Sequence, residues 1–129
     1  MNTVYTHKID AHRRLCIIKD LNELAFWMHT LECFNDELDH FSMLEKYLIK
    51  NSSISNTIKA IRRKHILMMA TLCKYEQELK TEYEYGKTEY NKVRLKLHEQ
   101  KCENYLQLHQ DYHKFKNQIF NILKTYRKE

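Results

Sequence analysis

Eight histidines are spread over 129 residues, and several of them fall on apolar helical faces. His65 stands between Ile61 and Met68 on one such face. Glu37 and His40 form a Glu-x-x-His step, which projects both side chains to one side of a helix. Imidazole nitrogen and carboxylate oxygen are ligands that zinc and iron accept in helical bundles. These residue types make a metal site the first chemical hypothesis.

Counting helical turns from two expected chain reversals puts several of these groups at one level. His40 and His65 each lie about three turns from a reversal near residues 51–54, and His65 and His109 each lie about 20 residues from Gly86. The predicted ligands of an iron or zinc ion are therefore Glu37, His40, His65 and His109. By the same count, His29, Glu76 and His98 lie near a second level.

The alternative is that these histidines are core side chains, hydrogen-bonded to carboxylates or to some of the nine tyrosines. A ferritin-like site needs two Glu-x-x-His steps, and the sequence has one. With Gly86 as the single glycine, a phosphate-binding loop is excluded, and Cys102 beside His98 has no oxyanion-stabilising turn. We predict no catalytic residue, and we favour the core interpretation of the histidines.

The elements that position these residues must be long helices. The chain has no proline, and an apolar stripe recurs every three or four residues from Leu24 to Leu48. Similar stripes follow, with an Asn/Ser cluster at 51–56 and Gly86 between them. We predict one domain over 1–129, an all-α antiparallel up-down-up bundle of three long helices, at about 9–50, 55–85 and 88–126, with coiled-coil-like packing.

Local signals predict where these helices begin and end. Asp10 is expected to cap the first helix, with Asp20 or Asn22 as the cap of a later start if the first segment is separate. Ser53 or Ser55 is expected to cap the second helix, and Thr88 the third. Gly86 suits the left-handed position that follows a helix, although an unbroken helix through it is the alternative.

The third helix carries a second apolar stripe, which leaves room for a protein partner or a homodimer. The residues of this stripe are Val93, Leu97, Leu108, Phe115 and Ile122.

Charge and composition limit the function classes. The net charge is +5, and most basic residues are interleaved with acidic ones, which favours a solvated helix face of mixed charge. The small basic clusters that could bind nucleic acid are Arg13-Arg14, Arg62-Arg63-Lys64 and Lys124 to Lys128. No apolar run is long enough for a membrane span, and the first residues lack the apolar core of a signal peptide. The four cysteines are isolated, so we expect buried free thiols and a cytoplasmic location.

The segment 26–41 resembles the first helix of a family of short, all-helical, uncharacterised proteins from Bacteroidota-type bacteria. The matching positions are Trp27, Leu31, Phe34, Asp36-Glu37-Leu38 and Phe41, followed by His65 and by the aromatics Phe115 and Phe120. This resemblance covers most of residues 24–126. It implies the helical fold and carries no assigned activity.

The abundance of apolar helical surface and the scarcity of loops, where catalytic groups usually lie, favour a non-catalytic function. We expect a small cytoplasmic interaction or scaffold protein that uses the second stripe of the third helix. The alternatives are the metal-binding bundle described above and, more weakly, a nucleic-acid-binding protein.

Overall fold

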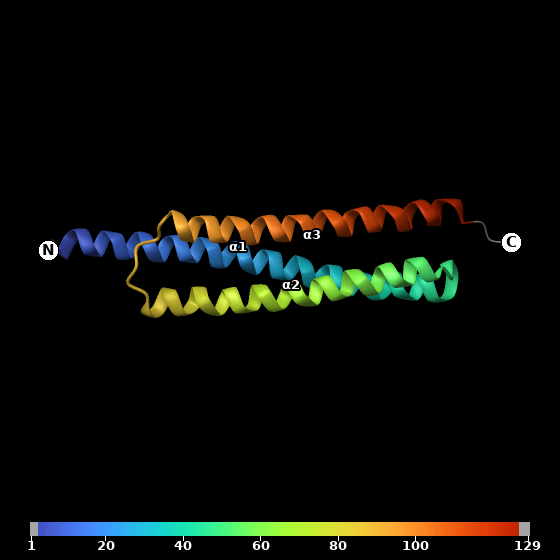
Figure 1. The fold of residues 1–129 in the computed structure, drawn as a ribbon, viewed down its shortest axis with the longest axis horizontal. Helices are drawn as coiled ribbons and strands as arrows, with labels where there is room; N and C mark the ends of the chain where they lie inside the picture. Colours follow the sequence, from blue (N-terminus) through green and yellow to red (C-terminus); the bar gives the residue numbers. More distant parts are fainter. Residues whose placement is uncertain (1–2, 127–129) are drawn as a thin grey trace.

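The computed structural model describes residues 3–126 and confirms the all-α class and the up-down-up bundle of three helices (Figure 1). Helix α1 (Thr3–Leu44) continues into a π-helical turn η1 (Glu45–Ile49), and α2 (Ser52–Tyr85) returns antiparallel to it. Helix α3 (Lys92–Thr125) then runs parallel to α1. The N-terminal end of α1 extends past the connection between α2 and α3 (Figure 1).

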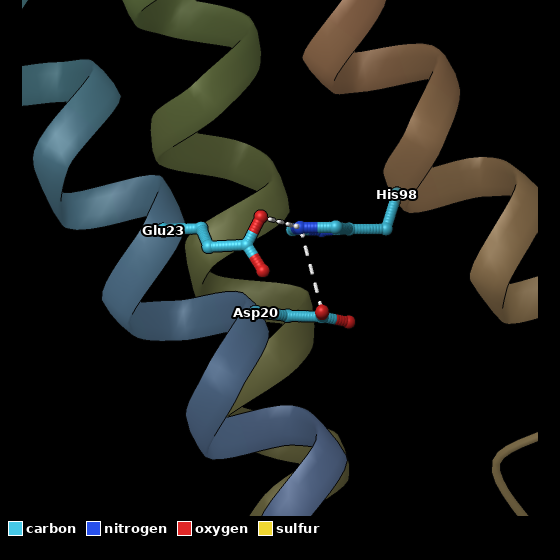
Figure 2. Close-up of side chains that lie close together, drawn as sticks. All are labelled: Asp20, Glu23 and His98. Atoms are coloured by element: carbon cyan, nitrogen blue, oxygen red, sulfur yellow. Dashed lines mark hydrogen bonds and ion pairs between the residues drawn. The ribbon is translucent and has the colours of Figure 1, made fainter.

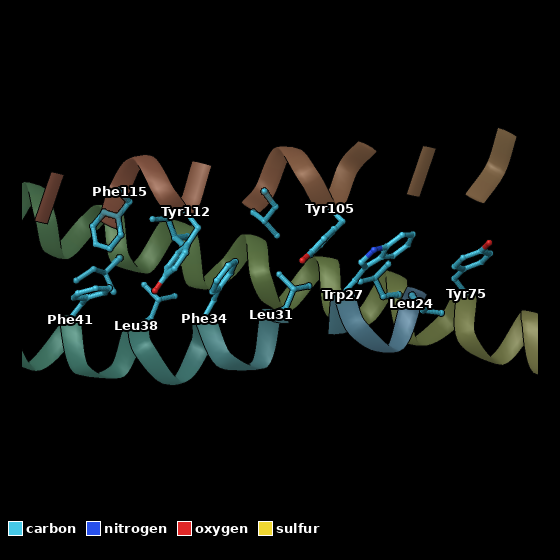
Figure 3. Packing of buried hydrophobic residues seen from close by; sticks show 14 of the residues in the cluster. Leu24, Trp27, Leu31, Phe34, Leu38, Phe41, Tyr75, Tyr105, Tyr112 and Phe115 are labelled. Atoms are coloured by element: carbon cyan, nitrogen blue, oxygen red, sulfur yellow. The ribbon is translucent and has the colours of Figure 1, made fainter. Parts of the chain in front are cut away.

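The core is built on the apolar stripe of α1. Leu24, Leu31 and Leu38 are completely buried at seven-residue intervals, and Trp27, Phe34 and Phe41 repeat the same interval beside them. Large aromatic side chains fill the space between α1 and α3, where Phe34 stacks on Tyr112 and Trp27 stacks on Tyr105 (Figure 3). Burying a side chain of this size contributes about 1.5 to 3 kcal/mol, so this stripe determines how the bundle packs.

The first connection is closed by backbone geometry and an asparagine. Lys50 adopts a left-handed conformation (φ 50°, ψ 52°), and its N–H donates to the carbonyl of Glu45 at 2.6 Å. The Asn51 side chain then accepts from the N–H groups of Ser53 and Ile54. The cap of α2 is therefore Asn51 and not Ser53 or Ser55, because Asn51 is the extended residue directly before α2 and both serines already lie inside the helix.

The second connection corrects two expectations. Gly86 ends α2 in an extended conformation (φ −71°, ψ 148°), so the predicted left-handed geometry is wrong. What favours glycine here is space, since a Cβ atom would lie 2.5 Å from the carbonyl oxygen of Glu82. The cap of α3 is Asn91, whose side chain accepts from the N–H of Arg94, and Thr88 lies outside any helix.

The first helix begins at Thr3, six residues earlier than predicted, and Asp10 lies inside it. Asp10 does not cap a helix but pairs with Arg13 at 2.8 Å and Arg14 at 3.2 Å, one turn further on. Arg13 is 1% exposed and donates to the backbone carbonyl of Glu82 at 2.5 Å. This contact ties the end of α2 to α1.

The second stripe of α3 divides into a buried and an exposed part. Leu108 and Phe115 belong to the core, whereas Val93 and Leu97 are exposed.

The four cysteines, which we expected to be buried, are exposed or half-buried free thiols. None of the helices described between residues 3 and 126 is long and apolar enough to cross a membrane.

Candidate metal centre

Three potential metal ligands converge between α1 and α3. Asp20 and Glu23 lie one turn apart on α1, and the ring of His98 approaches them from α3 (Figure 2). One ligand atom from each residue lies within 4.8 Å of the other two, and no other set of three His, Cys, Asp or Glu side chains does so in the described part of the chain. This group is therefore the candidate site.

The distances from His98 to the two carboxylates fit the ligand spacing of a tetrahedral ion. The Nε2 atom of His98 lies 3.4 Å from Oδ1 of Asp20 and 3.4 Å from Oε2 of Glu23. These separations are long for charge-assisted hydrogen bonds, which measure about 2.7 to 2.9 Å. Metal bonds of about 2.0 to 2.2 Å at the tetrahedral angle place two ligand atoms about 3.4 Å apart. The two distances from His98 therefore match those between ligands of one ion and are long for an ion-pair network, and the two carboxylate oxygens lie within 4.8 Å of each other.

The imidazole of His98 is held in place on two sides. The side chain is 3% exposed, its Nδ1 atom lies 2.7 Å from the hydroxyl oxygen of Tyr75, and Trp27 stacks against the ring with centroids 5.1 Å apart. When Nδ1 carries the proton, it donates to Tyr75, and Nε2 presents its lone pair to the carboxylates. An oriented second nitrogen of this kind accompanies most metal-binding histidines.

Asp20 is a carboxylate in the core, because its side chain is only 1% exposed. The hydroxyl of Tyr90 donates to its Oδ2 atom. Its Oδ1 atom accepts no hydrogen bond and lies 3.4 Å from both Lys19 Nζ and His98 Nε2. A buried carboxylate oxygen without a close donor is costly, so Asp20 is the member of the group that gains most from a cation.

Lys19 supplies an exposed positive charge beside the two carboxylates. Its ammonium group lies 2.9 Å from Glu23, and this hydrogen bond lowers the pKa of Glu23 and raises the pKa of Lys19. The Lys19 side chain is 58% exposed, so it can turn into solvent without leaving a buried gap. Glu23 is thus ionised at neutral pH and accessible to a competing cation.

A small cavity of about 80 Å³ adjoins the cluster. Its lining includes Asp20 and the rings of Tyr75 and Tyr90, and Arg94 lies at its edge, paired with Glu82 at 2.9 Å. Burial raises the pKa of both tyrosines, with a further contribution from the charge of Asp20, so both phenols stay protonated. Of the three ligands, Asp20 alone lines this space, which can hold a water molecule beside its carboxylate.

The four residues predicted from the sequence lie elsewhere, and the structure does not bring their ligand atoms together as a group. His65 and His109 do share a level, since both rings pack against Phe34 with centroids 6.0 and 5.2 Å away. His65, however, makes its hydrogen bond to Asn35 at 3.2 Å, and His40 is exposed.

Glu37, the remaining member of the predicted set, has protein partners of its own. It accepts from the hydroxyl of Tyr112 and lies 3.1 Å from Lys116. Burial alone would raise the pKa of Glu37, but these two partners outweigh it and the pKa is lowered.

Sequence reasoning placed His98 at a second level but with the wrong neighbours. His29 faces solvent beside Cys33, and Glu76 lies 3.6 Å from Lys80, so neither joins His98. The missed residue is Asp20, and a signal for it exists. Asp20 precedes Trp27 by seven residues and continues the series of Phe41, Phe34 and Trp27, which places a carboxylate at a core position.

Comparison with protein-family models, with curated proteins and with solved structures finds no match for this chain. The resemblance to the Bacteroidota-type helical proteins stays a prediction. The functional argument therefore depends on the geometry of the site.

Proposed function

We propose that this bundle binds a divalent transition-metal ion, zinc or iron(II), through Asp20, Glu23 and His98. The observation that carries the proposal is the equal 3.4 Å separation of His98 Nε2 from one oxygen of each carboxylate. The donor set of one imidazole and two carboxylates, with no sulfur, suits these borderline and hard ions. The ion would join α1 to α3 near the connection between α2 and α3, where Tyr90 donates to Asp20.

Charge balance supports a cation at this position. Asp20 and Glu23 contribute two negative charges, which a divalent ion would neutralise, and neutral His98 adds none. Lys19 then moves aside, because its contacts with both carboxylates compete with the metal. In the absence of metal, a protonated His98 can pair with both carboxylates, which gives a purely structural role; the experiment below separates these two roles.

The test is metal binding by purified, untagged protein, measured by elemental analysis and by calorimetric titration with zinc and with iron(II) under reducing conditions. We expect one ion per chain at this site. Removal of a residue that only supports a metal ligand typically weakens binding tenfold to a hundredfold. Asp20→Asn and His98→Gln, which remove ligands themselves, should each weaken binding by at least that factor. Tyr75→Phe should weaken it less, because the His98 ring keeps its stacking on Trp27.

The matched controls are Glu37→Gln and His40→Ala, which alter the ligand set predicted from the sequence. Binding should survive both, because Glu37 is engaged by Tyr112 and His40 lies in solvent. Binding that is lost in the controls and kept in Asp20→Asn would refute the proposal. Binding that is absent in the parent protein would make the cluster an ion-pair network.

A second proposed function, an interaction or scaffold protein, is favoured by apolar side chains in solvent. Leu15, Phe26 and Met43 are more than half exposed along α1. Leu108 and Phe115, which we had expected at the contact surface, are core residues, so the outer face of α1 is the better candidate. Replacing Leu15 and Phe26 by serine should abolish self-association measured by sedimentation and keep helix content; unchanged association would contradict this surface.

Nucleic-acid binding remains the weakest proposal. Arg62 pairs with Asp39 at 2.9 Å, so part of the Arg62-Arg63-Lys64 cluster is engaged within the protein. Of the C-terminal cluster, Arg127 and Lys128 lie outside the described residues.

The free thiols of the four cysteines support the proposal that the protein works in a reducing cytoplasm.

A further inference from the structure

An imidazole and a thiol, two side chains of types that can bind metal, lie close together on the exposed side of α1. His29 and Cys33 are one helical turn apart, both are exposed, and the Nε2 atom of His29 lies 3.7 Å from the Sγ atom of Cys33. We propose that this pair is half of a surface zinc site, which a second copy of the chain completes with its own His29 and Cys33. This site goes beyond the buried one and shares no residue with it.

The spacing of the pair matches the bite of a tetrahedral zinc ion. Zinc bonds of about 2.3 Å to sulfur and 2.0 to 2.1 Å to nitrogen, at the tetrahedral angle, place the two atoms about 3.5 Å apart. The observed 3.7 Å needs only a small side-chain adjustment. Without metal, the same contact is a thiol–imidazole hydrogen bond, which positions both groups before zinc arrives.

The surrounding charge favours a cation at this pair. Residues 21–44 contain five acidic residues and no lysine or arginine, although the whole chain carries a net charge of +5. Glu32 and Asp36 are exposed on the same stretch of helix as the pair. This local field raises the concentration of divalent cations around the pair.

A similar pair on the same helix provides a natural comparison. His12 and Cys16 have the same spacing in sequence and lie 3.6 Å apart. Their neighbours are Arg13, Arg14 and Lys19, and Cys16 is half-buried. These basic residues are themselves paired with Asp10, Asp20 and Glu23, so the His12–Cys16 pair lies in a mixed field. Similar geometry in a less acidic setting predicts that zinc prefers the His29–Cys33 pair.

A second copy is the occupant that completes the site. Structural zinc takes four protein ligands, and the described residues of one chain offer only these two here. A two-fold axis beside Cys33 supplies an identical pair and gives a Cys₂His₂ site, in which two thiols release their protons and the two thiolates balance the charge of Zn²⁺. Phe26, 65% exposed one turn away, would be covered in such a dimer.

The same acidic surface makes the dimer depend on zinc. Two copies that approach through Glu32 and Asp36 repel each other, and the repulsion falls when the ion lies between them. We therefore expect a monomer in EDTA and a dimer when zinc is present.

The test is the mass of the full chain in solution, measured by sedimentation in EDTA and with added zinc chloride, with a phosphine reductant present throughout. Zinc should double the mass from that of the 15.9 kDa chain, and EDTA should reverse the change. Cobalt(II) should give thiolate-to-metal charge-transfer absorption, which the sulfur-free buried site cannot produce. Cys33→Ser and His29→Ala should abolish the doubling, and Cys16→Ser, the matched control, should keep it.

Asp20→Asn separates this inference from the proposed buried site, because it should lose the buried ion and still dimerise, with one ion per two chains. A chain that stays monomeric with zinc overturns the inference, as does a zinc-dependent dimer that persists in Cys33→Ser. Dimers that form only when the reductant is omitted identify a disulfide at Cys33 and also overturn it. Circular dichroism of each variant checks that its helix content is unchanged.

Discussion

His65 provides the sharpest test of how the core treats its histidines. The side chain is completely buried, Nδ1 contacts Asn35 at 3.2 Å, and Nε2 has no hydrogen-bond partner. Burial, together with the charge of Arg62, lowers the pKa of His65 from 6.5 to about 4. The imidazole is thus neutral in the folded protein down to acidic pH, as a core residue should be.

The size of the effect on stability follows from linkage. Above pH 6.5 the imidazole is neutral in both the folded and the unfolded protein, so His65 does not make the free energy of unfolding depend on pH. Between pH 6.5 and about 4 only the unfolded chain binds the proton, so the free energy of unfolding falls as the pH is lowered. One pKa unit corresponds to about 1.36 kcal/mol, so the loss is about 2 kcal/mol on going from pH 7 to pH 5. It levels off near 3 kcal/mol below about pH 4.

The measurement is urea unfolding followed by far-ultraviolet circular dichroism at pH 7 and pH 5, for the parent protein and for His65→Gln. Glutamine can still reach Asn35 but does not titrate, so the variant should lose about 2 kcal/mol less than the parent over this interval. The comparison of two pH slopes removes the contribution of His109, whose pKa is also lowered by burial and by His113. Equal slopes would refute the assignment of His65 as a buried neutral base.

Two further substitutions test the packing and the second connection. Leu31→Ala, at a completely buried position of the α1 stripe, should cost about 2 to 5 kcal/mol in urea unfolding, and a loss below 1 kcal/mol would contradict that burial. Gly86→Ala should cost about 1 to 3 kcal/mol, because the added Cβ meets the carbonyl of Glu82; an unchanged unfolding midpoint would show that the connection relaxes freely.

The fold was largely predictable because each helix carries its own periodic signal. The stripe from Leu24 to Phe41 is buried as predicted, and the scarcity of glycine and proline left few places for chain reversals. The ends were harder. Several residues near each connection can cap a helix, and the choice of Asn51 and Asn91 depends on where the preceding helix stops.

The site was less predictable because two things decide which side chains meet: the height of each residue along the bundle axis, and the rotation of its helix about its own axis. Counting turns gives only the first. Counting turns correctly placed His65 and His109 at one level, around Phe34. It could not show that Glu37 would find Tyr112, since that contact depends on how α3 is rotated. Asp20 could have been identified from the sequence, because it is a charged residue at a position of the seven-residue repeat that the core side chains follow. Arg13, seven residues earlier, is another buried charged residue of the same repeat.

The two buried histidines show why neighbours matter more than position on a stripe. His65 and His98 both occupy core positions and both contact aromatic rings. His65 has Arg62 nearby and a neutral amide as its partner, so a cation there would be repelled and poorly coordinated. His98 faces two carboxylates at 3.4 Å, with Tyr75 orienting its second nitrogen. The same residue type is therefore expected to be inert in the first setting and a metal ligand in the second.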